Sequence, residues 1–399
     1  MENPKSKRLF NSNFLKVSLA SLFMYTGFYL VMPIIAPYSQ EVLGVEPSMS
    51  GIIAASYIIT ALLMRPFSGY FVDRYDRKKF YMTVFVLFAL MFTGYIAISD
   101  TVGGLILTRV LLGATFSLVT TAAGTLAIDV VSSEHRADGI GYYAAIIVLA
   151  MAIGPMVGLY LIEIFSYNDL FKFATLSCWI GVAIGAMVKT KPHAPVIHEK
   201  LSLDRFFMRE GLSMAAVISI IYFLYGSLMV YVALYIKELA IGVNSGNFFL
   251  FFALGIISAR WVTGNALRHG KYNRVLLIGT SLIVISGILF TTALTMKTFI
   301  PVSLLLGLGF GMISPCIQSM IIDLGPSNRR GTANSTYYIA IDGGTGVGML
   351  FGGVIAQNTS YTTLYQIGAA LALFAIVVYV GYAKRNYETK LNEYRDTLK

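Results

Sequence analysis

Twelve apolar runs, each long enough to cross a membrane as a helix, constrain this chain more than any other feature. A helix needs about 20 apolar residues to cross a hydrocarbon core about 30 Å thick. Lipid offers no hydrogen-bond partner to an open strand edge, and the runs lack the alternation typical of strands. The sequence therefore predicts an all-α membrane protein with twelve transmembrane helices. They are expected at about residues 14–36, 50–69, 79–98, 103–129, 139–163, 169–188, 211–236, 247–267, 274–294, 299–322, 331–356 and 362–383.

The composition agrees with this prediction, because 56% of the 399 residues are hydrophobic and only 13% are charged. Soluble domains have about 45–50% apolar and about 25% charged residues. The first run is too long for a cleaved signal peptide and is expected to remain as a span. Cys178 and Cys316 both lie inside apolar runs and are interpreted as packing residues. No metal-ligand or nucleotide motif is present, so we expect no metal, no cofactor and no enzyme activity.

The basic residues predict the orientation. The two terminal segments and the loops on their side of the membrane hold 24 of the 30 Lys and Arg residues. Basic residues mark the cytoplasmic side. We therefore expect a multi-pass protein of the plasma (inner) membrane with both termini in the cytoplasm. The net charge of +10 is then spread over cytoplasmic loops, and no nucleic-acid partner is expected.

The second half of the chain repeats the first at an offset of about 194 residues. Asp129 then corresponds to Asp323, and DVVSSEHRADGIGYY corresponds to DLGPSNRRGTANSTY. The sequence predicts an N-terminal six-helix bundle over residues 1–188, a cytoplasmic linker over 189–210, and a C-terminal six-helix bundle with a cytoplasmic tail over 211–399. Two pseudo-symmetric bundles with a site between them are typical of transporters.

Three local motifs resemble those of the major facilitator superfamily. GYFVDRYDRKK (69–79) resembles the signature between spans 2 and 3, with Asp76 in place of its second glycine. LTRVLLGA (107–114) resembles the span-4 motif that contains an arginine, here Arg109. The third motif is associated with antiporters and is matched in part, with Ala150 and Leu159 in place of two glycines. Its matching residues are Gly154, Pro155 and Gly158.

The resemblance implies the MFS fold and a role for each motif. In the family the loop acts as a conformational switch, and its aspartate meets the start of span 11, here residues 326–334. The alternative is that the loop only sets topology. The residues assigned to the switch are Gly69, Asp73, Arg74, Arg77 and Lys78. The span-5 residues Gly154, Pro155 and Gly158 are assigned to helix packing.

Two charged residues inside predicted spans are candidates for proton coupling. Arg109 is about six residues into its span, and the family motif gives it a role in coupling or binding. A buried structural contact with a carbonyl or a tyrosine is the alternative. Asp342 lies about 16 Å deep in span 11, and it has no basic residue within one turn of sequence. Intramembrane charges are costly unless they are paired or line a cavity. Asp342 is therefore our main candidate, against a carboxyl held by hydrogen bonds.

Aromatic residues in spans 1, 7 and 11 are candidates for substrate binding, since their rings suit an amphipathic or cationic substrate. They are Tyr25, Tyr29, Tyr222, Tyr225 and Tyr338. The glycines that follow Asp342 recur at every fourth position, at Gly344, Gly348 and Gly352, which favours close helix packing over a nucleotide loop.

Together, these features predict a secondary active transporter, a proton-coupled exporter of small drug-like or metabolite molecules working by alternating access. The expected partners are a small organic substrate, a proton as coupling ion and the lipid bilayer, and the protein is expected to be a monomer. Import of a nutrient by proton symport or uniport is the alternative. A non-transport membrane protein on the same scaffold is a third possibility.

Overall fold

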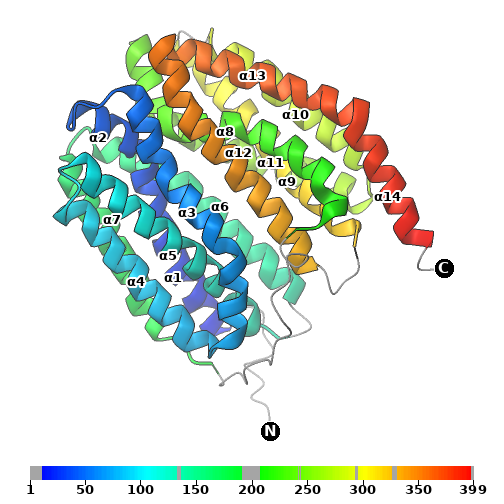
Figure 1. Ribbon diagram of the computed structural model, residues 1–399, viewed down its shortest axis with the longest axis horizontal. Helices are drawn as coiled ribbons and strands as arrows, with labels where there is room; N and C mark the ends of the chain where they lie inside the picture. Colours follow the sequence, from blue (N-terminus) through cyan, green and yellow to red (C-terminus); the bar gives the residue numbers. More distant parts are fainter. Residues whose placement is uncertain are drawn as a thin grey trace. The chain divides into compact units, whose positions relative to one another are not determined.

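The computed structural model describes residues 11–132, 136–190, 207–240, 242, 244–292, 295–325 and 330–396. Within these residues the chain is helical and has no strand. Twelve helical segments are long and apolar enough to span a membrane, which confirms the predicted fold class. The chain is therefore a multi-pass membrane protein (Figure 1).

Contacts within the chain divide it into two compact units. Unit 1 comprises residues Met1–Gly44 and Ser56–Glu199, and unit 2 comprises Val45–Ala55 and Lys200–Lys399. Unit 1 contains α1 (Ser12–Val31), the 3-10 turn η2 (Met32–Ile34), α2 (Ile35–Glu41), most of α3 (Pro47–Arg74), α4 (Arg77–Ala97), α5 (Val102–Asp129), α6 (Arg136–Leu161) and α7 (Tyr167–Ala186).

Unit 2 contains the remaining helices and the first part of α3. In chain order they are η5 (Arg209–Gly211), α8 (Leu212–Leu239), α9 (Gly246–Arg268), α10 (Tyr272–Phe290), α11 (Met296–Asp323), α12 (Arg330–Asn358), α13 (Tyr361–Val378), the π-helical turn η7 (Tyr379–Ala383) and α14 (Lys384–Asp396).

The two units pack their helices in the same order. In unit 1, α1 contacts α6 and α7, and α4 contacts α5 and α7. In unit 2, α8 contacts α12 and α13, and α10 contacts α11 and α13. The sequence repeat pairs α1 with α8, α4 with α10, α5 with α11, α6 with α12 and α7 with α13. The contacts between helices therefore follow the sequence repeat. The corresponding helices α1 and α8 are the most buried spans of their units.

Glycines allow α8 and α12 to approach closely. A Cβ atom built on Gly344 would lie 2.1 Å from the carbonyl oxygen of Ser219, and one on Gly348 would lie 2.0 Å from that of Phe223. Gly226 on α8 has the same relation to the carbonyl oxygen of Thr345, at 2.1 Å. A side chain at any of these positions would overlap the backbone of the facing helix. This packing fixes the register between α8 and α12.

The beginning of α3 belongs to unit 2 because it packs on the end of α12. The Ser48 backbone N–H donates to the side-chain oxygen of Gln357 (3.1 Å), and the Gln357 amide donates to Glu46. A Cβ atom on Gly353 would lie 2.2 Å from the Pro47 carbonyl oxygen. The helix therefore begins in unit 2 and ends in unit 1.

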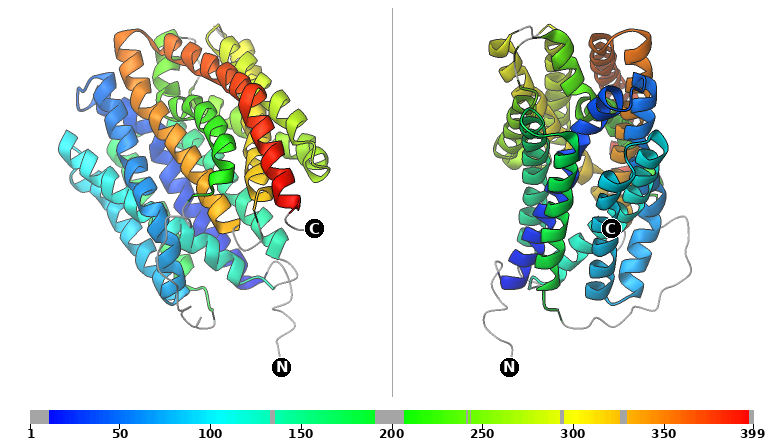
Figure 2. Two further views of the ribbon diagram at one scale, coloured as in Figure 1. Left: turned by 45° about the vertical axis from the view of Figure 1, so that its right-hand side comes forward. Right: turned by 90° about the vertical axis from the view of Figure 1, so that its left-hand side faces the viewer.

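The first and last spans differ from simple rods. The first predicted span is interrupted by η2, since Pro33 lies within that turn. At the other end, the helix continues past the predicted boundary through η7 into α14. The views in Figures 1 and 2 show α13 and α14 as one long, bent helix. A π-helical turn inserts one extra residue and is a common cause of such a bend.

Candidate functional site

Arg109 lies in the interior of unit 1 and contacts three different helical segments. It is 1% exposed, and one Nη donates to the Tyr95 hydroxyl at 3.2 Å. The other Nη lies 3.9 Å from the Met32 sulfur, and the guanidinium carbon is 4.7 Å from the centre of the Tyr57 ring. A buried cation over an aromatic face is attracted by the ring quadrupole. These contacts correspond to the structural alternative for Arg109, and its role in coupling stays a prediction.

Aromatic rings of α1 and α5 form a cluster close to Arg109. Phe28 and Phe116 stack with centroids 4.2 Å apart, and Tyr57 meets Phe28 edge-on at 5.3 Å. Tyr25 is 6.1 Å from Phe116 and 6.3 Å from Tyr29. Tyr25 is buried and Tyr29 is half-buried. The two predicted tyrosines of span 1 therefore belong to one aromatic cluster, which Tyr57 connects to the arginine.

The antiporter-motif residues of α6 lie against α1. Gly154 and Gly158 are buried, and a Cβ atom on Gly154 would lie 2.6 Å from the Cβ of Tyr29. One on Gly158 would lie 2.5 Å from the Leu30 carbonyl oxygen, and Pro155 is buried between the two glycines. This close contact sets the position of Tyr29 on α1.

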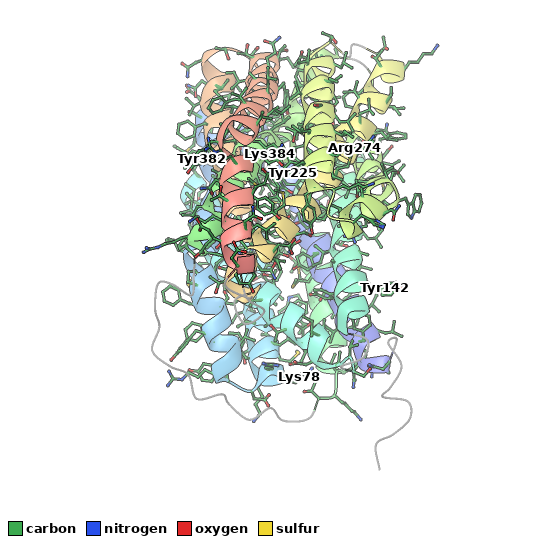
Figure 3. The ribbon with its side chains drawn as sticks, turned by 90° about the vertical axis from the view of Figure 1, so that its right-hand side faces the viewer. Lys78, Tyr142, Tyr225, Arg274, Tyr382 and Lys384 are labelled. Carbon is green, nitrogen blue, oxygen red and sulfur yellow. The ribbon has the colours of Figure 1, made fainter. Side chains whose placement is uncertain are left out.

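Three basic residues of the loop signature contact groups within unit 1. Arg77 binds both carboxylate oxygens of Asp129 at 2.6 Å. Lys78 donates to the Gly185 carbonyl oxygen near the end of α7, and Figure 3 shows Lys78 at one end of its bundle. Arg74 lies over the Tyr70 ring at 5.6 Å. Arg77 and Lys78 therefore connect the start of α4 to α5 and α7.

The departure from the loop signature at Asp76 has a local explanation. Asp76 is the N-cap of α4, and its side chain accepts from the Lys79 backbone N–H at 2.9 Å. Its backbone has a negative φ of −56°, so this turn does not need glycine. Gly69 is exposed and has open space around it. The side chain of Asp73 and residues 326–329 lie outside the described part of the chain.

A second cluster in unit 2 combines aromatic rings with hydroxyl groups. The hydroxyls of Tyr222 and Ser314 are 2.5 Å apart and join α8 to α11. The ring centroids of Tyr222 and Tyr225 are 5.1 Å apart, and Phe310 lies within 5.7 Å of both. Tyr225 is labelled in Figure 3. The two tyrosines predicted in span 7 therefore lie next to each other in a buried cluster.

Asp342 borders the unit 2 cluster. It is half-buried, and both Asp342 and Tyr338 lie close enough to Tyr222 to interact with it electrostatically. Tyr338 precedes Asp342 by four residues, which places both on one face of α12. Tyr338 is 44% exposed, and its ring is 5.2 Å from that of buried Tyr337. The structure thus brings together three predicted residues: Asp342, Tyr222 and Tyr338.

Sequence reasoning missed several residues of the two clusters. In unit 1 these are Met32, Tyr57, Tyr95 and Phe116, and in unit 2 they are Phe310 and Ser314. Ser314 is 92 residues from its partner Tyr222, so no local pattern indicates their contact. Asp129 is 52 residues from Arg77, but its match to Asp323 in the repeat marked it as a position of interest.

The twelve spanning segments among the described residues and the matching helix contacts of the two units define a multi-pass membrane protein built from a repeated helical unit. The chain belongs to the Major Facilitator Superfamily, whose family model matches residues 17–344 and 268–396. This membership confirms the resemblance seen in the sequence motifs.

Similar proteins include an export protein, a drug-resistance protein and solved transporters of the same fold. The chain is 22% identical to the "Staphylopine export protein" of Staphylococcus aureus strain Mu50, over 92% of this chain and 94% of that protein. It is 24% identical to the "Quinolone resistance protein NorA" of S. aureus strain MRSA252, over 89% and 93%. Among solved structures, a POT family peptide transporter matches with a TM-score of 0.76 and 12% identity, over 94% and 97% of the chains. The nucleoside transporter NupG matches with a TM-score of 0.75 and 14% identity, over 93% and 100%.

Proposed function

We propose that this chain is a proton-coupled exporter of small organic molecules that works by alternating access. We further propose that it is a monomer in the plasma (inner) membrane with both termini in the cytoplasm. The names of the two S. aureus relatives refer to export of staphylopine and to quinolone resistance, which supports outward transport. The excess of basic residues on one side supports the orientation.

The observation that carries the proposal is the position of Asp342. It lies within a membrane-spanning helix, it is half-buried, and it is within electrostatic range of Tyr222, whose hydroxyl contacts Ser314. A carboxyl group in a span can change its charge by taking up one proton, whereas the surrounding hydroxyls stay neutral. The anionic form would bind a cationic or amphipathic substrate beside the tyrosine rings, and the protonated form would release it.

Transport by purified protein in liposomes with an imposed pH gradient tests this proposal. We would measure ethidium, a quinolone and staphylopine, with wild-type protein and with Asp342→Asn. Asn has nearly the same shape as Asp but does not titrate. We expect the variant to bind substrate and to exchange labelled for unlabelled substrate, but to lose accumulation against a gradient.

The matched control is Asp100→Asn, which makes the same change at an exposed loop position and should transport as the wild type does. Full pH-driven accumulation by Asp342→Asn would exclude this residue from coupling. Substrate and proton moving in the same direction would instead support the symport alternative.

A further inference from the structure

An open pocket of about 470 Å³ lies in unit 2 at the beginning of α8. Two short helical faces line it. One is formed by η5 and the first turns of α8, and the other by η7 and α14. The helix α14 packs against both η5 and α8. The lining residues are Arg209, Glu210, Leu212, Ser213, Ala216, Tyr382, Asn386 and Lys390. None of the transport residues discussed above lines this pocket.

The spacing of the lining residues explains why they face one pocket. Ser213 follows Arg209 by four residues, and Ala216 follows Ser213 by three. Tyr382, Asn386 and Lys390 are separated by four residues each. Residues three or four apart share one face of a helix. The two faces are held together by the Ser213 hydroxyl, which donates to the side-chain oxygen of Asn386 at 3.0 Å.

Both signs of charge are present in the pocket. Arg209 and Lys390 are cationic, and Lys390 lies 2.8 Å from Glu393, an ion pair on the surface of α14. Glu210 is anionic and interacts electrostatically with Lys390. One carboxylate oxygen of Glu210, Oε2, is buried and has no hydrogen-bond donor among the described residues. A buried carboxylate oxygen without a donor is unfavourable, so a ligand that donates a hydrogen bond would stabilise it.

The other side of the pocket is apolar and exposed on the surface of unit 2. Leu212 is 48% exposed and Tyr382 is 62% exposed, and Ala216 continues this surface along α8. Tyr382 lies at the bend before α14 and is labelled, with Lys384, in Figure 3. Tyrosines are enriched at the boundary between membrane and water. The pocket therefore passes from charged groups to an apolar surface over about two turns of helix.

We propose that this pocket binds the headgroup of a phospholipid that carries a primary amine beside its phosphate. Arg209 and Lys390 bind the phosphate, and the ammonium group donates to Glu210 Oε2. The acyl chains lie along Leu212, Ala216 and Tyr382. A trimethylated amine has no N–H to donate, and a phosphoglycerol headgroup offers Glu210 only neutral hydroxyl donors, so neither forms the charge-assisted hydrogen bond. The pocket therefore distinguishes phosphatidylethanolamine from phosphatidylcholine and phosphatidylglycerol of the same chain length.

Native mass spectrometry of the full-length, delipidated protein tests this proposal. Phosphatidylethanolamine, its N-methylated derivatives, phosphatidylcholine and phosphatidylglycerol with identical chains are added in turn. We expect phosphatidylethanolamine to be retained roughly tenfold better than phosphatidylcholine, the order expected for one charge-assisted hydrogen bond. Glu210→Gln should remove this preference, and Arg209→Gln should weaken binding of all the lipids.

The control is Arg385→Gln, which removes one positive charge from an exposed position of α14 outside the pocket and should change nothing. The thermal transition of each variant shows that it is folded. Equal retention of phosphatidylethanolamine and phosphatidylcholine by wild-type protein would contradict the proposal. So would an effect of Arg385→Gln equal to that of Arg209→Gln. Displacement of the lipid by an equal concentration of soluble O-phosphoethanolamine would indicate a site for a soluble ligand, and would also overturn it.

Discussion

The contact between α8 and α12 makes a sharp prediction about glycine. A Cβ atom at Gly348 would lie 2.0 Å from the Phe223 carbonyl oxygen, and ordinary contacts of a Cβ atom begin at 3.4 Å. Gly348→Ala would therefore force the two backbones apart by about 1.4 Å, the difference between these distances. Overpacking of this kind costs about 1–3 kcal/mol. In a unit of about 200 residues, that corresponds to a decrease in Tm of roughly 2–12 °C.

A fluorescent thiol dye in detergent can measure this change, because the protein has two cysteines, Cys178 and Cys316, and both are buried. Gly343→Ala is the matched control, since it makes the same substitution on the same helix at a position where the added Cβ atom has no atom of another helix within 4 Å. Alanine is favoured over glycine in a helix by about 1 kcal/mol, so the control should be as stable as wild type or more stable. Equal Tm values for Gly348→Ala and Gly343→Ala would refute the close approach of the two helices.

Three further predictions concern unit 1 and the topology. Arg77→Gln and Asp129→Asn should each lower Tm. A double-mutant cycle should give a coupling energy of about 1 kcal/mol between the two side chains, because the pair is partly exposed. Additive effects of the two substitutions on stability would show that the side chains do not interact. Arg109→Lys keeps the charge but loses the planar group over an aromatic ring, so it should lower both Tm and transport; an unchanged variant would show that the guanidinium is not required. A cysteine that replaces exposed Glu163 should react with a membrane-impermeant maleimide on intact cells, whereas one that replaces exposed Lys79 should not. The reverse labelling would show that the protein has the opposite orientation.

The helices themselves could be predicted closely from the sequence. The sequence predicts span 11 at about 331–356, and α12 covers Arg330–Asn358, because lipid requires a long apolar run wherever a helix crosses it. The breaks were not predictable in this way. The turn at Pro33 and the π-helical turn at Tyr379–Ala383 lie in runs that stay apolar or helical on both sides.

The partners of the candidate residues could not be predicted, because lipid and protein interior are equally apolar. Leu63 is 65% exposed and Leu105 is fully buried, yet both occupy ordinary positions in apolar runs. Hydrophobicity therefore does not show which face of a span contacts another helix. Tyr and Phe together account for 51 residues, so composition also could not select the rings around Arg109 and Asp342.

The repeat conserves positions while the chemistry at those positions differs between the units. Arg77 binds Asp129 in unit 1, and at the corresponding place in unit 2 the Tyr272 hydroxyl hydrogen-bonds Asp323. The two candidates for coupling differ in the same way, since buried Arg109 lies in unit 1 and half-buried Asp342 lies in unit 2. Arginine keeps its proton under all conditions in a protein, whereas a carboxyl group exchanges it. A change of charge during the transport cycle is therefore expected at Asp342 in unit 2, whereas the charge of Arg109 in unit 1 is expected to stay constant.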